Sequence, residues 1–130
     1  MTHEARYRVH YEDTDMAGVV YYANYLKFIE RGRSEALREA GVDQRTMRDE
    51  GIVFVVKSLK ADYLAPGRYD DILSVRTDLI EMKGASATLA QSVDCDDVKL
   101  FEAEVRIACM STAGKPMRMP KIAAKALTSL

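Results

Sequence analysis

The stretch HYEDTDMAGVVYYANYLKFIE, residues 10–30, begins with acidic residues and continues with tyrosines and apolar residues. Three acids stand within its first six residues: Glu12, Asp13 and Asp15. A plain turn needs only one such residue. Gly18 follows, and then come tyrosines and apolar residues. The sequence therefore predicts an acid-rich turn over residues 12–21 that leads into a helix, with Gly18 in an unusual backbone conformation.

The period of the apolar residues becomes helical from about residue 22 to residue 40. The stripe expected to face the core consists of Tyr22, Leu26, Ile29, Leu37 and Ala40, with Phe28 and Ala36 beside it. Gly41 is a typical stop signal, and Asp43 is expected to cap a short second helix that reaches Glu50. Glu30 and Arg33 lie three residues apart, which predicts a surface or interface ion pair on the helix.

Strand patterns flank this helical region. Residues 5–11 alternate polar and apolar side chains and predict a first strand. Four longer strand-like runs follow Gly51: residues 52–64, 71–82, 87–95 and 99–110. Short turn segments (APGR, KGAS and DD) separate these runs, so they predict an antiparallel meander.

One long helix and five strands predict an α+β fold in which a curved antiparallel sheet wraps the helix. The 130 residues suffice for one domain, which is expected to cover residues 1–130. Such a sheet leaves an edge strand open, and open edges favour pairing between subunits. A homodimer or a homotetramer is therefore expected.

The acidic turn lies at the N-terminus of the only predicted long helix, a position that can support catalysis. Free N–H groups at a helix start can polarise a carbonyl oxygen, as an oxyanion hole does. A carboxylate just upstream can face the same carbonyl. Asp15 together with the backbone amide of Tyr22 thus suits acyl transfer to water, with Asp15 as nucleophile or as general base.

Three segments carry a family resemblance. RVHYEDTDMAGVVYYANYLKFIERGR, residues 8–33, is similar to the signature of the 4-hydroxybenzoyl-CoA thioesterase family. FVVKSLKADYLAPGRYDDILSVRTDLIEMKGAS, residues 54–86, and EAEVRIACM, residues 102–110, resemble its tol-pal system-associated, YbgC-type acyl-CoA thioesterases. The resemblance runs from about Tyr7 to Pro120. It implies a hot dog fold and hydrolysis of acyl-CoA without a metal or other cofactor, coenzyme A being part of the substrate.

The resemblance also assigns roles. The family's catalytic aspartate falls on Asp15, and its carbonyl-polarising backbone amide falls on Tyr22. Asp13 is expected to be structural and to bond a backbone amide or an arginine. The family pattern usually has His or Phe at position 22. The backbone N–H survives the change to Tyr22, whereas any role of an imidazole does not.

Further residues are expected to contact the substrate. Those assigned to the acyl group or its pocket wall are Tyr11, Met16, Gly18, Val19 and Val20. Those assigned to the phosphates of coenzyme A are Arg68, Lys83, Arg118 and Lys121. No acid follows Glu104, so the basic C-terminal segment is either such an anchor, which could also receive an acidic acyl carrier protein, or a solvated tail.

Charge, hydropathy and the lack of certain motifs argue against several other classes of function. A net charge of −1 argues against nucleic-acid binding, and no apolar run reaches the length of a membrane span. The N-terminus lacks an apolar signal core, so a cytoplasmic location is expected. The chain lacks phosphate-binding glycine motifs and zinc-like ligand spacing. The competing hypothesis is an adaptor that binds acyl carrier protein or coenzyme A with little catalysis.

Overall fold

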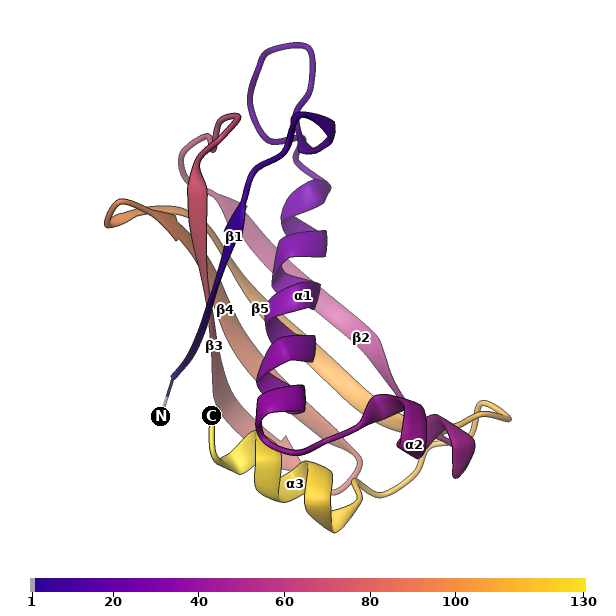
Figure 1. Cartoon of the computed structure of the whole chain (residues 1–130). Helices are drawn as coiled ribbons and strands as arrows, with labels where there is room; N and C mark the ends of the chain where they lie inside the picture. The colour runs from indigo at the N-terminus through magenta and orange to yellow at the C-terminus, as the bar shows by residue number, and fades with distance from the viewer. Residues whose placement is uncertain (1) are drawn as a thin grey trace.

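A five-stranded antiparallel sheet curves around one long helix, α1 (Asn24–Glu39), in a computed structural model that describes residues 2–130 (Figure 1). The strands are β1 (His3–Arg8), β2 (Ile52–Tyr63), β3 (Ile72–Lys83), β4 (Ser86–Cys95) and β5 (Val98–Ser111). All four neighbouring pairs are antiparallel. The expected α+β arrangement of one long helix and five strands is confirmed.

The strand order is β1-β3-β4-β5-β2, so the predicted four-strand meander is wrong at one connection. β3, β4 and β5 form the meander, whereas β2 crosses to the far edge and pairs with β5. The physical reason is that β1 occupies the edge of β3 that a β2–β3 hairpin would need. The connection over residues 64–71 is also longer than the two to five residues typical of hairpins.

The first strand is shorter than expected and ends at Arg8 rather than at residue 11. Residues Tyr11–Asp13 form a short 3₁₀ turn instead, named η1. The backbone N–H of His10 donates to the carboxylate of Asp13 at 2.8 Å, which closes the chain into this turn.

The core-facing side of α1 differs from the predicted stripe. Phe28, Ile29, Ala36 and Leu37 are buried as expected, but Tyr22, Leu26 and Ala40 are exposed. The buried face also includes Tyr25 and Gly32 and lies against β1, β3 and β4. Gly32 adds no hydrophobic signal to a sequence pattern, and the predicted stripe is wrong at Tyr22, Leu26 and Ala40.

Gly32 is required because β3 approaches the helix closely at this point. A Cβ atom at position 32 would lie 2.5 Å from a methyl carbon of Val75, which is fully buried on β3. Val is stiff at χ1, so it cannot swing aside without disturbing its neighbours. The contact between helix and sheet therefore depends on the missing side chain.

Substituting Gly32 by Ala is expected to lower the free energy of unfolding by about 1–2 kcal/mol. Overpacking costs roughly 1–3 kcal/mol, and the better helix propensity of Ala offsets part of that cost. Urea unfolding followed by circular dichroism measures the change. Gly84→Ala is the matched control, because a Cβ there meets only Arg118 at an ordinary 3.6 Å. Equal stability of the two variants would contradict the close-approach argument.

Two short helices complete the fold. In α2 (Gln44–Asp49) the expected cap is confirmed, since the Asp43 carboxylate accepts from the Arg45 N–H at 2.9 Å. α3 (Lys121–Thr128) lies in the basic C-terminal segment, for which the sequence predicts a solvated tail or an anchor and no helix. Its buried residues Ala123, Ala126 and Leu127 have helical spacing and pack into the core.

A helix that crosses a bilayer needs about 20 apolar residues. None of the helices in residues 2–130 meets this requirement.

Candidate active site

The acid-rich loop projects beyond the N-terminal end of α1 (Figure 1) and is closed by backbone bonds. The N–H of Tyr21 donates to the carbonyl of Asp13 at 2.8 Å, and Thr14 forms a bridge with Val20. Val20 also donates to the carbonyl of Gly67 at 2.8 Å. The loop is therefore held at its base and against residues 64–71, which positions its tip.

Asp13 is the structural acid of the loop, as predicted. Its side chain is buried, and each carboxylate oxygen has its own donor. One accepts from the backbone N–H of His10 at 2.8 Å, and the other accepts from the side-chain amide of Asn24 at 3.0 Å. The partner is thus a backbone amide together with an asparagine rather than an arginine. Asp13 ties the start of the loop to the first residue of α1.

Asp15 lies at the exposed tip of the loop. Its Oδ1 accepts from the backbone N–H of Ala17 at 2.9 Å, and its carbonyl accepts from Gly18 at 2.9 Å. Gly18 has φ +79°, in the left-handed region that favours glycine, which confirms its predicted backbone role. Within residues 2–130, the other carboxylate oxygen of Asp15 has no hydrogen-bond partner. The geometry therefore leaves one oxygen directed to solvent on an otherwise restrained side chain.

Tyr22 lies in the turn just before α1, which begins at Asn24 rather than at residue 22 as expected. The turn is closed by the N–H of Asn24, which donates to the carbonyl of Tyr21 at 2.8 Å. The backbone N–H of Tyr22 has no acceptor in the part of the chain that the structure describes. This donor is therefore free to bind an oxygen atom from outside the chain.

A tyrosine from β2, a residue not among the predicted site residues, holds the turn in place. The hydroxyl of Tyr63 donates to the carbonyl of Tyr22 at 2.9 Å. Burial raises the pKa of Tyr63 above its ordinary value of 10.0, so at neutral pH the hydroxyl is protonated and donates. Its ring packs edge-on against Tyr25 and Phe101. Sequence spacing could not reveal this contact, because 41 residues separate the two partners.

Tyr25 forms a second clamp, between α1 and the 64–71 connection. Its hydroxyl accepts from the N–H of Gly67 at 2.9 Å, and its ring stacks on Phe101. Burial raises the pKa of the Tyr25 hydroxyl, and the hydrogen bond from Gly67 opposes that shift. The helix start, β2 and this connection thus share one aromatic cluster.

The residues assigned to the acyl group differ in their exposure to solvent. Tyr11, Met16 and Gly18 are exposed in the single chain, and Val19 is half-buried. Val20 instead belongs to the hydrophobic core, where it is 4% exposed beside Gly67. Tyr11, Met16, Gly18 and Val19 are therefore the members of this group that a ligand can reach directly.

The four basic residues assigned to coenzyme A do not form one patch in a single chain. Arg68 precedes β3 and forms a backbone bridge with Val19, near the acid-rich loop. Lys83 ends β3, and Arg68 precedes the start of this 12-residue strand, which is about 36 Å long. Arg118 lies near Lys83, within 3.6 Å of the Cβ position of Gly84, and Lys121 begins α3. One bound phosphate therefore cannot contact the residues at both ends of β3.

The predicted ion pair between Glu30 and Arg33 is absent from residues 2–130 at a 4.0 Å limit. Glu30 accepts from the hydroxyl of Ser34 at 2.8 Å, and Arg33 donates to the side-chain oxygen of Gln91 at 2.9 Å. Both side chains instead line a pocket between α1 and β2. Their spacing along the helix allows a pair, but Glu30 bonds to its helical neighbour Ser34 and Arg33 bonds across the fold to Gln91 on β4.

Comparison with known proteins identifies the family. The sequence profile described as the thioesterase-like superfamily matches residues 9–127. The chain belongs to this superfamily. The acyl-CoA thioesterase YbgC of Haemophilus influenzae is 43% identical over 116 residues, which cover 88% of this chain and 85% of that protein. The acyl-CoA thioester hydrolase YbgC of Escherichia coli O6:H1 is 41% identical over 116 residues, which cover 88% and 87%.

A solved structure agrees with this assignment. The crystal structure of a probable thioesterase from Bartonella henselae superposes with a TM-score of 0.88 at 36% identity. The match covers 92% of this chain and all of that one. The predicted family, the hot dog fold and the thioesterase class of enzyme are thereby confirmed.

Proposed function

We propose that this thioesterase hydrolyses acyl-CoA to a free carboxylic acid and coenzyme A at the loop that precedes α1. The observation that carries the proposal is the presence of two unused groups on the same restrained loop. One is the free carboxylate oxygen of Asp15, and the other is the free backbone N–H of Tyr22. The YbgC acyl-CoA thioesterases that resemble this chain support the choice of substrate.

The backbone N–H of Tyr22 binds the thioester carbonyl oxygen and stabilises the negative charge that develops there. Tyr63 contributes by holding the Tyr22 peptide through its hydrogen bond to the carbonyl. Both contacts use backbone atoms of residue 22, the N–H and the carbonyl. The role in binding the thioester oxygen is therefore the same with tyrosine as with the histidine or phenylalanine of the family pattern.

Asp15 acts by one of two routes. As a nucleophile, its carboxylate oxygen attacks the carbonyl carbon, the C–S bond breaks, and an acyl-aspartyl anhydride forms that water then hydrolyses. As a general base, Asp15 takes a proton from water while the water oxygen attacks the same carbon, and the thiolate of coenzyme A leaves. A single turnover in isotopically labelled water separates the routes. Label that enters the Asp15 carboxylate supports the anhydride.

A thiol-release assay over acyl-CoA esters of different chain length, together with aromatic esters, tests the proposed function. Turnover of at least one ester by the wild-type protein is expected. The adaptor hypothesis predicts no turnover of any ester combined with tight binding of acyl carrier protein, and this result would overturn the proposal. Acyl carrier protein as a partner and a cytoplasmic location stay predictions.

We also propose that the active protein is a homodimer or a homotetramer. β2 forms one edge of the sheet, is 12 residues long, and has a neighbour on one side only within the described chain. Val56 and Leu59 on this strand are exposed apolar residues. A second copy that pairs along β2 would provide hydrogen-bond partners for the open backbone N–H and C=O groups of this edge and would cover these side chains.

Leu59→Lys is expected to raise the dissociation constant of the dimer at least about tenfold, because it introduces a charge between the two copies that pair along β2. Light scattering and sedimentation at micromolar concentration measure the shift. Lys60→Arg, which keeps the charge of an exposed neighbour on the same strand, is the control. A wild-type protein that is monomeric and fully active at that concentration would refute the proposal.

A further inference from the structure

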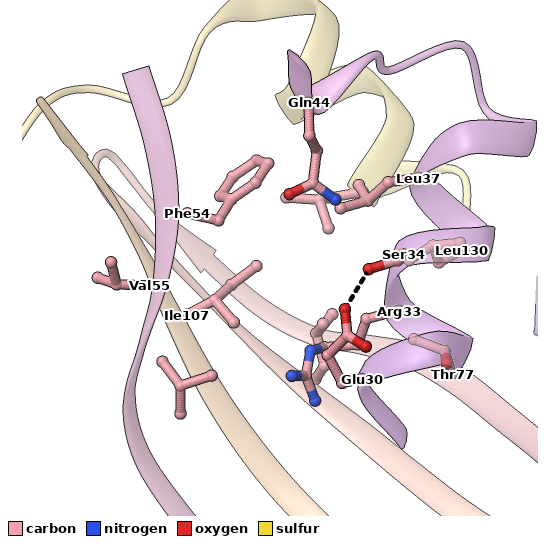
Figure 2. Close-up of a pocket in the computed structure, with 13 residues that line it drawn as sticks. Glu30, Arg33, Ser34, Leu37, Gln44, Phe54, Val55, Thr77, Ile107 and Leu130 are labelled. Atoms are coloured by element: carbon pink, nitrogen blue, oxygen red, sulfur yellow. Dashed lines mark hydrogen bonds between the residues drawn. The ribbon is translucent and has the colours of Figure 1, made fainter. Parts of the chain in front are cut away.

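A pocket of about 200 Å³ lies between α1 and β2. Figure 2 shows Glu30, Arg33 and Ser34 entering it from the helix, with Phe54 and Ile107 on the sheet side. Its remaining walls are mainly apolar and include Leu37, Leu89, Leu127 and Leu130. The pocket contains neither Asp15 nor Tyr22, so the proposed hydrolysis does not account for it.

Arg33 is the unusual member of this lining. Its side chain is partly buried, and burial lowers the pKa of the guanidinium while the charge of Glu30 opposes the shift. An arginine has five N–H donors and stays charged in proteins. The hydrogen bond found for Arg33 goes to the neutral side chain of Gln91. No carboxylate within residues 2–130 lies within 4.0 Å of its guanidinium.

The support of Arg33 is rigid. Gln91 is 2% exposed, and its amide nitrogen donates both to the carbonyl of Ile29 and to the hydroxyl of Thr77, each at 2.9 Å. These bonds connect α1, β3 and β4 beneath the pocket. The guanidinium is thus a fixed cation beside apolar walls. A partly buried guanidinium that bonds no carboxylate directly has donors left to bind an anion.

We propose that this pocket binds the carboxylate end of a short amphipathic acid. The carboxylate pairs with Arg33, and the hydrocarbon lies against Phe54, Ile107 and Leu127. The volume is below the 300–1,000 Å³ or so of typical drug-sized sites, which matches a short chain. Glu30 lies at the same site, bonded to Ser34, and its negative charge weakens the binding of any anion.

This carboxylate has two possible sources. It is either a free carboxylic acid or the distal carboxylate of a dicarboxylic acyl group attached to coenzyme A. The second source rests on the proposed hydrolysis of acyl-CoA, whereas the first does not.

Calorimetric titration with hexanoate tests the site directly. The wild-type protein is expected to bind hexanoate, and Arg33→Gln to bind it at least tenfold more weakly. Glu30→Gln is expected to bind it several-fold more tightly, because the repelling charge is gone. Hexan-1-ol is the uncharged control ligand, and its affinity should change little in either variant.

Further measurements control for unfolding of the variants and for the position of the bound ligand. Thermal unfolding checks that the variants fold, and Arg33→Lys, which keeps the cation, should restore part of the affinity. The side-chain amide signal of Gln91 in NMR spectra should shift on titration of the wild-type protein. A wild-type protein that binds no hexanoate at millimolar concentration, or an Arg33→Gln variant of unchanged affinity, would overturn the proposal.

Comparing adipoyl-CoA with hexanoyl-CoA identifies the source. If the distal carboxylate occupies the pocket, Arg33→Gln lowers kcat/KM at least tenfold more for adipoyl-CoA than for hexanoyl-CoA. If both esters change equally while hexanoate binding weakens, the free acid is the occupant. Absence of wild-type turnover on all esters would refute the proposed function but leave the hexanoate result standing.

Discussion

Replacing Asp15 by Asn is expected to lower turnover of acyl-CoA by at least about a hundredfold while leaving the fold unchanged. An amide serves neither as nucleophile nor as general base, and such groups contribute on the order of 10²–10⁴ to the rate. The side-chain oxygen of Asn can still accept from the Ala17 N–H, so the loop keeps the hydrogen bond that restrains its tip. Steady-state thiol release and thermal unfolding together measure both parts of this prediction.

Asp13→Asn is the matched control two residues away, and its effect should fall on stability. Both carboxylate oxygens of Asp13 accept hydrogen bonds, from His10 and from Asn24. An asparagine has one acceptor oxygen, so its NH₂ group would face a donor, at a cost of about 1–3 kcal/mol. If Asp13→Asn instead abolished turnover in a stable protein while Asp15→Asn remained active, the assignment of the two acids would be reversed.

Tyr22→Pro is expected to reduce hydrolysis by roughly 10²–10³-fold, the loss measured when one oxyanion donor is removed elsewhere. Proline lacks the backbone N–H. Since no group in residues 2–130 accepts from this N–H, the substitution breaks no hydrogen bond of the described chain. Proline is also tolerated at the start of a helix.

Tyr22→Phe provides the comparison, because it keeps the N–H and removes only the hydroxyl. Most of the turnover should remain. Tyr22→His should also stay active and gain a pH dependence near the imidazole pKa of about 6.5. Circular dichroism must show the same helix content in all three variants. If Phe were as inactive as Pro, the hydroxyl would be the chemical group and the backbone role would be wrong.

Local features of this protein could be predicted from its sequence because they depend on neighbouring residues. The long helix follows from a repeating apolar pattern, and Asp43 caps α2 through N–H groups two and three residues away. Gly18 adopts a positive φ within its own tight turn, and Asp13 bonds to His10 three residues before it. In each case the deciding interaction spans a few residues, so the sequence order alone determines it.

The contacts that join distant elements depend on three-dimensional packing and do not follow from local sequence patterns. The position of β2 beside β5 depends on β1 taking the edge of β3, and the buried side of α1 depends on the close approach of Val75 to Gly32. Tyr63 reaches the Tyr22 carbonyl across 41 residues, and Arg33 prefers Gln91, 58 residues away, to its helical neighbour Glu30. These choices depend on the shape of packed surfaces, which hydrophobic period and charge spacing along a chain do not encode.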